Sequence, residues 1–221
     1  MPILTFRTKR WSKSVLKRGK PSLGSGISSP KGREIRIIGV DPGLGATGFG
    51  LIEMGSDGTI LYRGSGVIRS PSTLSFPQRI QRIYRRLAEE IKNYTPHLMA
   101  VEQPFFAKNV KSAMLLGQAR GVAILAAAEA GVEVHEYSPL EVKQAVVGYG
   151  RAAKEQVQAM IYSLLHPPEN LKADAADALA VALCLAHSFS WKNSLRLLAA
   201  QKSPAGTRWK DRTGDWLEGR G

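Results

Sequence analysis

The chain has 221 residues, of which 43% are hydrophobic, so one domain with or without tails is expected. It contains no run of about 18 apolar residues, the length needed to cross a membrane. Its formal net charge is +13, with nine Lys or Arg and no acid in residues 1–33, fifteen of each sign in 34–189, and seven basic against three acidic residues in 190–221. The central segment is therefore neutral, and net charge alone cannot support nucleic-acid binding.

The two basic end segments are predicted to lie outside the folded domain of residues 34–189. Residues 1–33 are rich in Ser, Gly, Lys and Arg without a sustained period, which indicates a disordered extension. A phosphate-binding tail, an organelle transit segment and an over-extended start remain open for it, and we expect no essential role. Residues 190–221 are predicted to begin with a short helix and to be mostly disordered. The single cysteine, Cys184, excludes an internal disulfide and suits a reducing compartment, so a cytoplasmic location is expected.

Three strands joined as hairpins are predicted first, at residues 34–41, 47–54 and 61–69, because short apolar runs alternate there with glycine-rich turns. A helix then follows and ends before Pro96. Its apolar residues recur at helical spacing: Ile80, Ile83, Leu87, Ile91 and Tyr94.

Helices and strands alternate in the second half of the chain. Residues 97–104 read as a buried fourth strand, and residues 112–130 as an Ala-rich helix closed by Gly131. A fifth strand at 131–137 precedes Ser138, which begins a capping box with Glu141.

Two more helices complete the predicted order, one with Val157, Met160, Ile161 and Leu164 on one face and one at residues 171–187. Hairpins followed by alternating helices and strands predict an α/β domain with a mixed five-stranded sheet flanked by helices.

Two acids stand at strand ends. Asp41 and Glu102 each end an apolar run, where acids are unfavourable. Asp41 also suits a turn. If the first and fourth strands are parallel neighbours, the two carboxylates lie side by side at the edge where open sheets gather ligands.

Asp174 and Asp177 head the apolar last helix and share one helical face. A helix N-cap with a first-turn acid explains them without a function. If the helix start meets the edge of Asp41 and Glu102, however, four carboxylates repel one another, and either protonation or divalent cations would relieve that repulsion. All-oxygen ligands suit Mg²⁺ or Mn²⁺ rather than zinc.

Four phrases in order and spacing resemble the RuvC family of Holliday-junction resolvases: GVDPGLGATGFGLIE, VEQPFFAKNVKSAMLLGQARGVAILAA, VKQAVVGYGRAAKEQVQ and ADAADALAVAL. The resemblance runs from about Ile35 to His187. It implies a ribonuclease-H-like fold, a homodimer, and symmetric cutting of four-way DNA junctions in recombination and repair, which leaves 5′-phosphate and 3′-hydroxyl ends. It also implies two Mg²⁺ per active site, with Mn²⁺ as a substitute, and a branch-migration complex as partner.

By position, Asp41, Glu102, Asp174 and Asp177 match the four catalytic, metal-binding carboxylates of that family. Among the DNA-binding positions, Phe105 matches an aromatic residue that stacks on junction bases, although it could instead fold back on the core. Lys143 and Lys154 match basic residues near the family's active site. Lys154 is also expected in the first turn of its helix, where a nearby phosphate would offset the unfavourable dipole.

Two other functions remain open from the residues. DPGLGATG could cradle a phosphate as in an actin-like ATPase or sugar kinase, although about 155 core residues leave little room for a second domain. A non-catalytic junction-binding protein is the other alternative. The Ala-rich helix is the candidate dimer interface, and Arg120 could support DNA or pair within the dimer.

Overall fold

The structure is a computed structural model that describes residues 34–103 and 110–202. A five-stranded mixed sheet with the order β3-β2-β1-β4-β5 forms its centre. β1 pairs antiparallel with β2 and parallel with β4, β2 pairs antiparallel with β3, and β4 pairs parallel with β5. The five strands are β1 Ile35–Asp41, β2 Ala46–Met54, β3 Ile60–Arg69, β4 Leu98–Glu102 and β5 Glu133–Tyr137. The predicted mixed sheet is confirmed.

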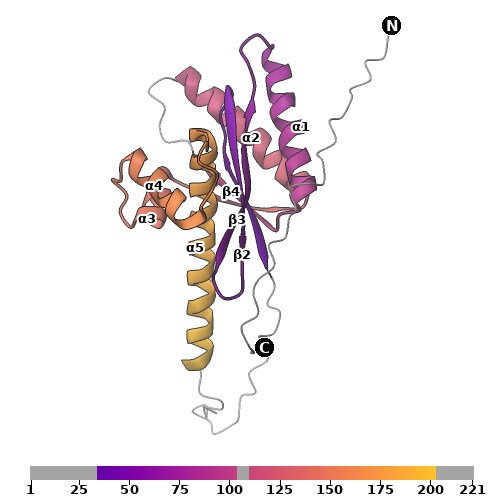
Figure 1. Ribbon diagram of the computed structural model, residues 1–221. Helices are drawn as coiled ribbons and strands as arrows, with labels where there is room; N and C mark the ends of the chain where they lie inside the picture. The colour runs from indigo at the N-terminus through magenta and orange to yellow at the C-terminus, as the bar shows by residue number, and fades with distance from the viewer. Residues whose placement is uncertain (1–33, 104–109, 203–221) are drawn as a thin grey trace, which may run out of the picture. The chain divides into compact units, whose positions relative to one another are not determined.

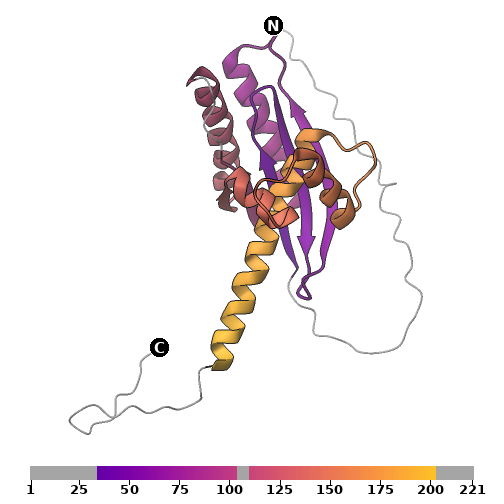
Figure 2. The same cartoon turned by 90° about the vertical axis from the view of Figure 1, so that its left-hand side faces the viewer.

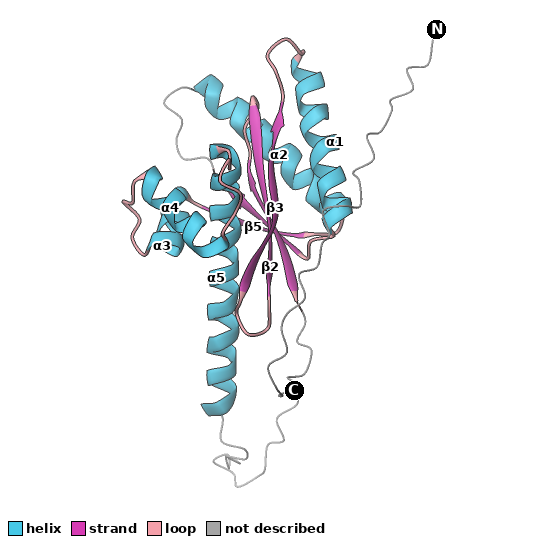
Figure 3. Ribbon diagram, in the orientation of Figure 1, coloured by secondary structure: helices cyan, strands magenta, loops and turns pink. Residues whose placement is uncertain are grey.

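Helices cover both faces of this sheet. Figures 1 and 3 show α1 and α2 on one side and α3, α4 and α5 on the other. The helices are α1 Phe76–Tyr94, α2 Val110–Glu129, α3 Pro139–Val147, α4 Lys154–Leu165 and α5 Ala173–Lys202. None of the helices in the described part of the chain is long and apolar enough to cross a membrane.

Two hydrophobic cores follow from the alternation of side chains along the strands. In β1, Ile38 and Val40 pack against α1 and α2, whereas Ile37 belongs to the core beneath α3, α4 and α5. In β4, Met99 and Val101 face α1 and α2, whereas Leu98 and Ala100 face α5. Because side chains alternate along a strand, these residues show to which face the remaining side chains of β1 and β4 point.

The local signals that predict helix ends are confirmed. Ser138 and Glu141 form the capping box of α3, with the Ser138 N–H donating to Glu141 Oε2 at 2.7 Å. Gly131 has a φ of +69° after α2, and its N–H donates to the Ala128 carbonyl oxygen. α1 ends at Tyr94, two residues before Pro96.

Two predictions about helices differ from the structure. The buried stripe of α4 is Val157, Ile161 and Leu165, while Leu164, predicted on that face, is 40% exposed. α5 also does not stop near His187, since its backbone continues to Lys202 and incorporates the short helix predicted after residue 190. Figure 2 shows the last part of α5 extending away from the sheet.

Candidate active site

Asp41 and Glu102 lie side by side at one edge of the sheet. β1 and β4 are parallel neighbours, and Val40 pairs with Val101, so the next residue on each strand is one of the two acids. Asp41 follows the parity of Ile37, and Glu102 that of Ala100, which places both acids on the α5 face. The predicted juxtaposition is present.

Glycines bring α5 unusually close to this part of the sheet. A Cβ added at Gly48, the β2 partner of Asp41, would lie 1.9 Å from the Asp174 carbonyl oxygen. One added at Gly39 would lie 2.1 Å from the Ala178 carbonyl oxygen. The backbone of α5 therefore packs directly against the backbone of β1 and β2, which holds the first turns of α5 over the end of β1.

Asp174 and Asp177 are both partly buried at the start of α5. The helix begins at Ala173, so Asp174 lies within the first turn rather than at the N-cap considered for it. The N-cap explanation thus does not account for Asp174, although an acid in the first turn still suits the helix dipole.

Electrostatics show that the acids form one cluster. The pKa of Asp41 is raised from 3.8 to about 6, mainly by burial, then by Asp177 and Asp174. The pKa of Glu102 is raised from 4.5 to about 7, mainly by burial, then by Asp41 and Asp177. Desolvation and like charge both penalise the ionised forms. A compensating positive charge is therefore favoured here.

Lys154 supplies part of that charge. It is the first residue of α4, as predicted, and its Nζ donates to Asp177 Oδ2 at 2.6 Å, which raises the pKa of the lysine. The positive charge of Lys143 on α3 lowers the pKa of Glu102 and so offsets part of the increase caused by burial and the neighbouring acids. Glu102, Lys143, Lys154 and Asp177 all line one pocket of about 220 Å³ between α3, α4 and α5. The structure thus brings both predicted lysines to the acids.

The donor set suits a hard divalent cation, because it consists of carboxylate oxygens that are partly desolvated and mutually repulsive. As the side chains lie, no three His, Cys, Asp or Glu residues in the described ranges converge closely enough to surround an ion. The four acids are therefore within electrostatic range without forming a closed ligand set. Asp177 is engaged by Lys154 in this arrangement.

Arg120 has a partner within the chain. Its guanidinium bonds to the Glu136 carboxylate of β5, and Gln103 Nε2 donates to the same carboxylate at 3.2 Å. Gln103 directly follows Glu102, and its backbone N–H donates to the Tyr137 carbonyl oxygen at 2.8 Å. Arg120 thus supports the segment that leaves the site. No local sequence signal marks Glu136, because its pairing depends on the order of strands.

Phe105, predicted to stack on DNA bases, lies outside the described residues. Its role therefore stays a prediction.

The strand order, the acids at the ends of β1 and β4, and the acidic start of α5 define a ribonuclease-H-like protein with an acidic site of the kind found in nucleases. The sequence model of the family "Crossover junction endodeoxyribonuclease RuvC" matches residues 37–185. The chain belongs to the RuvC family.

Similar proteins agree with this assignment. The crossover junction endodeoxyribonuclease RuvC of Geobacter metallireducens is 51% identical over 162 residues, which cover 73% of this chain and 98% of the relative. The protein of the same name from Pelotomaculum thermopropionicum is 48% identical, with the same coverage.

Among solved structures, Thermus thermophilus RuvC in complex with Holliday junction substrate is similar with a TM-score of 0.67 and 34% identity, over 72% of this chain and 96% of the solved chain. The yeast mitochondrial Holliday junction resolvase has a TM-score of 0.55 over 78% of this chain and 88% of its own, and its 14% identity shows the fold alone.

Proposed function

We propose that this protein is a structure-selective endonuclease that resolves four-way DNA junctions by cutting two strands symmetrically, in homologous recombination and DNA repair. The observation that carries the proposal is that Asp41, Glu102, Asp174 and Asp177 form one electrostatically coupled group in a chain of the RuvC family. The family assignment favours a nuclease over an actin-like ATPase or sugar kinase. Retention of all four acids favours a catalyst over a non-catalytic junction-binding protein.

Asp41, Glu102, Asp174 and Asp177 are the proposed metal ligands, with Mg²⁺ as the natural ion, two per site, and Mn²⁺ as a substitute. The chemistry that such ions supply when bound is activation of a water molecule and stabilisation of charge on the scissile phosphate. The carboxylates would hold and orient the ions, and none of them has to transfer a proton. The products would be 5′-phosphate and 3′-hydroxyl ends.

The two lysines act on the substrate in this proposal. Lys154 already bears a carboxylate partner, Asp177, at 2.6 Å. If Asp177 binds a cation, the ammonium group becomes available to offset negative charge on the phosphate. Lys143, beside Glu102 in the same pocket, would bind a DNA phosphate group next to the scissile phosphate.

The proposed assembly is a homodimer that joins through α2. This helix exposes large apolar side chains, with Val110 77%, Met114 62% and Leu125 50% exposed. A Cβ added at Gly117 or Gly121 would meet nothing within 4 Å, so a second helix could approach there. A two-fold dimer presents two equivalent sites to a junction that has matching symmetry. We propose the bacterial cytoplasm as compartment and, from the resemblance alone, a branch-migration complex as partner.

The decisive experiment compares the wild type with Asp41→Asn on a labelled four-way junction and a linear duplex of the same sequence. The wild type with Mg²⁺ should cut the junction and spare the duplex. The variant should bind the junction but lose cleavage by about 10²-fold or more, since it lacks a group needed in the transition state. Cleavage by the variant at the wild-type rate would refute the proposed site.

A further inference from the structure

One stretch of the chain carries an unusual surplus of arginine. From Gly58 to Ala88 there are six arginines and no acid, although the folded segment as a whole is neutral. Two of the six have carboxylate partners: Arg63 pairs with Glu53 at 2.5 Å and Arg86 with Glu89 at 2.6 Å. Four positive charges remain.

These four, Arg69, Arg79, Arg82 and Arg85, form what we call the arginine corner, where the end of β3 meets the first half of α1. Arg82 Nε donates to the Arg69 carbonyl oxygen at 2.8 Å, and Arg79 Nε to the Ser70 carbonyl oxygen at 3.2 Å. Both side chains are thereby directed toward the end of β3. Within the described ranges none of the four lies within 4.0 Å of a carboxylate.

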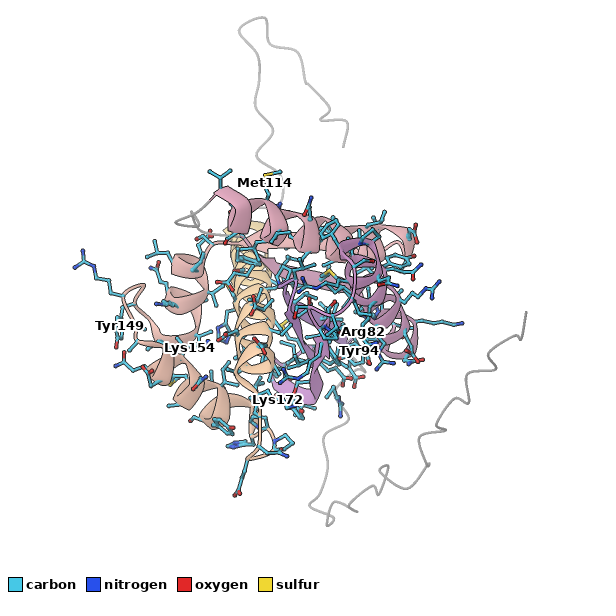
Figure 4. All side chains as sticks on the ribbon, turned by 90° about the horizontal axis from the view of Figure 1, so that it is seen from above. Arg82, Tyr94, Met114, Tyr149, Lys154 and Lys172 are labelled. Atoms are coloured by element: carbon cyan, nitrogen blue, oxygen red, sulfur yellow. The ribbon has the colours of Figure 1, made fainter. Side chains whose placement is uncertain are left out.

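The arginine corner is at the same edge of the sheet as the acids. Arg69 pairs with Ala46 on β2, only two residues before Gly48, the partner of Asp41. Strand spacing and rise place the Arg69 backbone roughly 12 Å from that of Asp41. Viewed from above in Figure 4, Arg82 and Lys154 lie on opposite sides of α5.

The charge arrangement is unfavourable for the isolated protein. α1 has no acid in its first turn, so no carboxylate of that turn complements the positive end of the helix dipole. Arg79, Arg82 and Arg85 follow at intervals of three residues, and like charges at this spacing repel. Arg69, Arg82 and Arg85 are exposed, so they are not needed to fill a core. A polyanion bound here would relieve both effects.

We propose that the arginine corner binds the phosphate backbone of one duplex arm as that arm leaves the active site. This proposal rests on the junction-cleaving function given above and adds a second DNA contact on the side opposite Lys154. The three arginines of α1 span ~9 Å, a length over which a duplex presents about five phosphates. The arginine corner should not distinguish DNA sequences, since it would contact only the phosphate backbone of the DNA.

The test is junction affinity measured by fluorescence anisotropy in EDTA over a salt series. The Arg69→Gln/Arg82→Gln/Arg85→Gln variant should bind about tenfold or more weakly, given the usual strength of charged hydrogen bonds. The slope of log affinity against log salt should fall by about one for each arginine removed. Trimming the junction arms should weaken the wild type more than the variant.

Two controls separate charge from folding. The matching triple Arg→Lys variant keeps the charges and should retain most of the affinity, and Lys92→Gln removes one exposed charge at the far end of α1 and should change nothing. Wild-type affinity and salt slope in the triple Gln variant, or equal losses in the Gln and Lys variants, would overturn the inference. If the wild type does not cut junctions, the proposed function fails, and the same salt slopes on linear duplex still decide the arginine corner.

Discussion

Asp41 and Glu102 are costly residues in the absence of a cation. Both are partly buried, and both have raised pKa values, about 6 and about 7. A protein that kept such acids only for structure would gain stability by replacing them, because desolvation of unpaired carboxylates is unfavourable. Their retention fits a site whose stability depends on a bound positive charge.

The metal-free protein should lose stability as pH rises. Both folded-state pKa values exceed the ordinary 3.8 and 4.5, so folding takes up protons. The resulting destabilisation is absent below about pH 4, where the acids are protonated in both states, and complete above about pH 7. Its size is on the order of a few kcal/mol. The thermal midpoint in EDTA should therefore fall from pH 5 to pH 8.

The matched control is Asp41→Asn/Glu102→Gln, in which every other titrating group remains. The difference in midpoint between variant and wild type should widen with pH, and Mg²⁺ should narrow it at pH 8. Parallel pH profiles of the two proteins would contradict the prediction.

The location of each acid at a strand end or helix start could be predicted from sequence, but the contacts among them could not. An acid that ends an apolar run marks a strand end, so the amino-acid pattern places Asp41 and Glu102 at the ends of two strands. Their pairing requires β1 and β4 to be parallel neighbours, which the pattern leaves open and the sheet order decides. The pairing of Lys154 with Asp177 depends on how α4 packs against α5, which involves residues 23 apart in sequence.

At the scale of elements, the glycines beneath α5 control where its acids lie. Gly48→Ala would place a methyl group 1.9 Å from the Asp174 carbonyl oxygen, and backbone on both sides leaves no flexible group to yield. The first turn of α5 must shift away from β1. We expect divalent-cation affinity, measured by calorimetry, to fall about tenfold or more, because metal sites tolerate displacements of only about 0.5 Å.

Gly64→Ala on β3 is the matched control, since its added methyl would meet only Leu51 Cδ1, at 3.4 Å. This variant should bind the ion like the wild type. Unchanged ion affinity in a folded Gly48→Ala protein would show that the close approach does not position the acids.

The exposed face of α2 makes a prediction about assembly. Figure 4 shows Met114 projecting from α2. Met114→Glu/Leu125→Glu should convert a dimer into monomers in analytical ultracentrifugation, because buried unpaired charges oppose association. Leu164→Glu, at a similarly exposed apolar residue of α4, should remain dimeric. A dimer of the double variant with wild-type stability would exclude α2 as the interface.

Helix ends with a local capping signal can be predicted from sequence, whereas helix packing and the end of α5 cannot. Capping at Ser138 and Gly131 depends on a few neighbouring residues, so local sequence is sufficient. The choice of Leu165 over Leu164 depends on which side of α4 meets α5, and the continuation of α5 to Lys202 has no stop signal at His187 to oppose it.

For the whole molecule, net positive charge is concentrated outside residues 34–189. Residues 1–33 carry nine basic residues and no acid. Deleting them should weaken binding to linear duplex and reduce its salt dependence, since phosphate contacts dominate non-specific affinity. Junction cleavage should persist, because the four acids and the arginine corner are retained. Gel-shift and cleavage assays on the same preparation separate the two effects, and loss of cleavage by a folded truncated dimer would contradict this expectation.

The late position of α5 has a consequence for synthesis. A ribosome releases Asp41 and Glu102 well before Asp174 and Asp177, and until α5 emerges the apolar residues of β1 and β4 on that face lack the cover that α5 provides. Neither half of the chain holds more than two of the four acids. A chain that ends before α5 therefore lacks half of the proposed metal ligands and should not cut DNA.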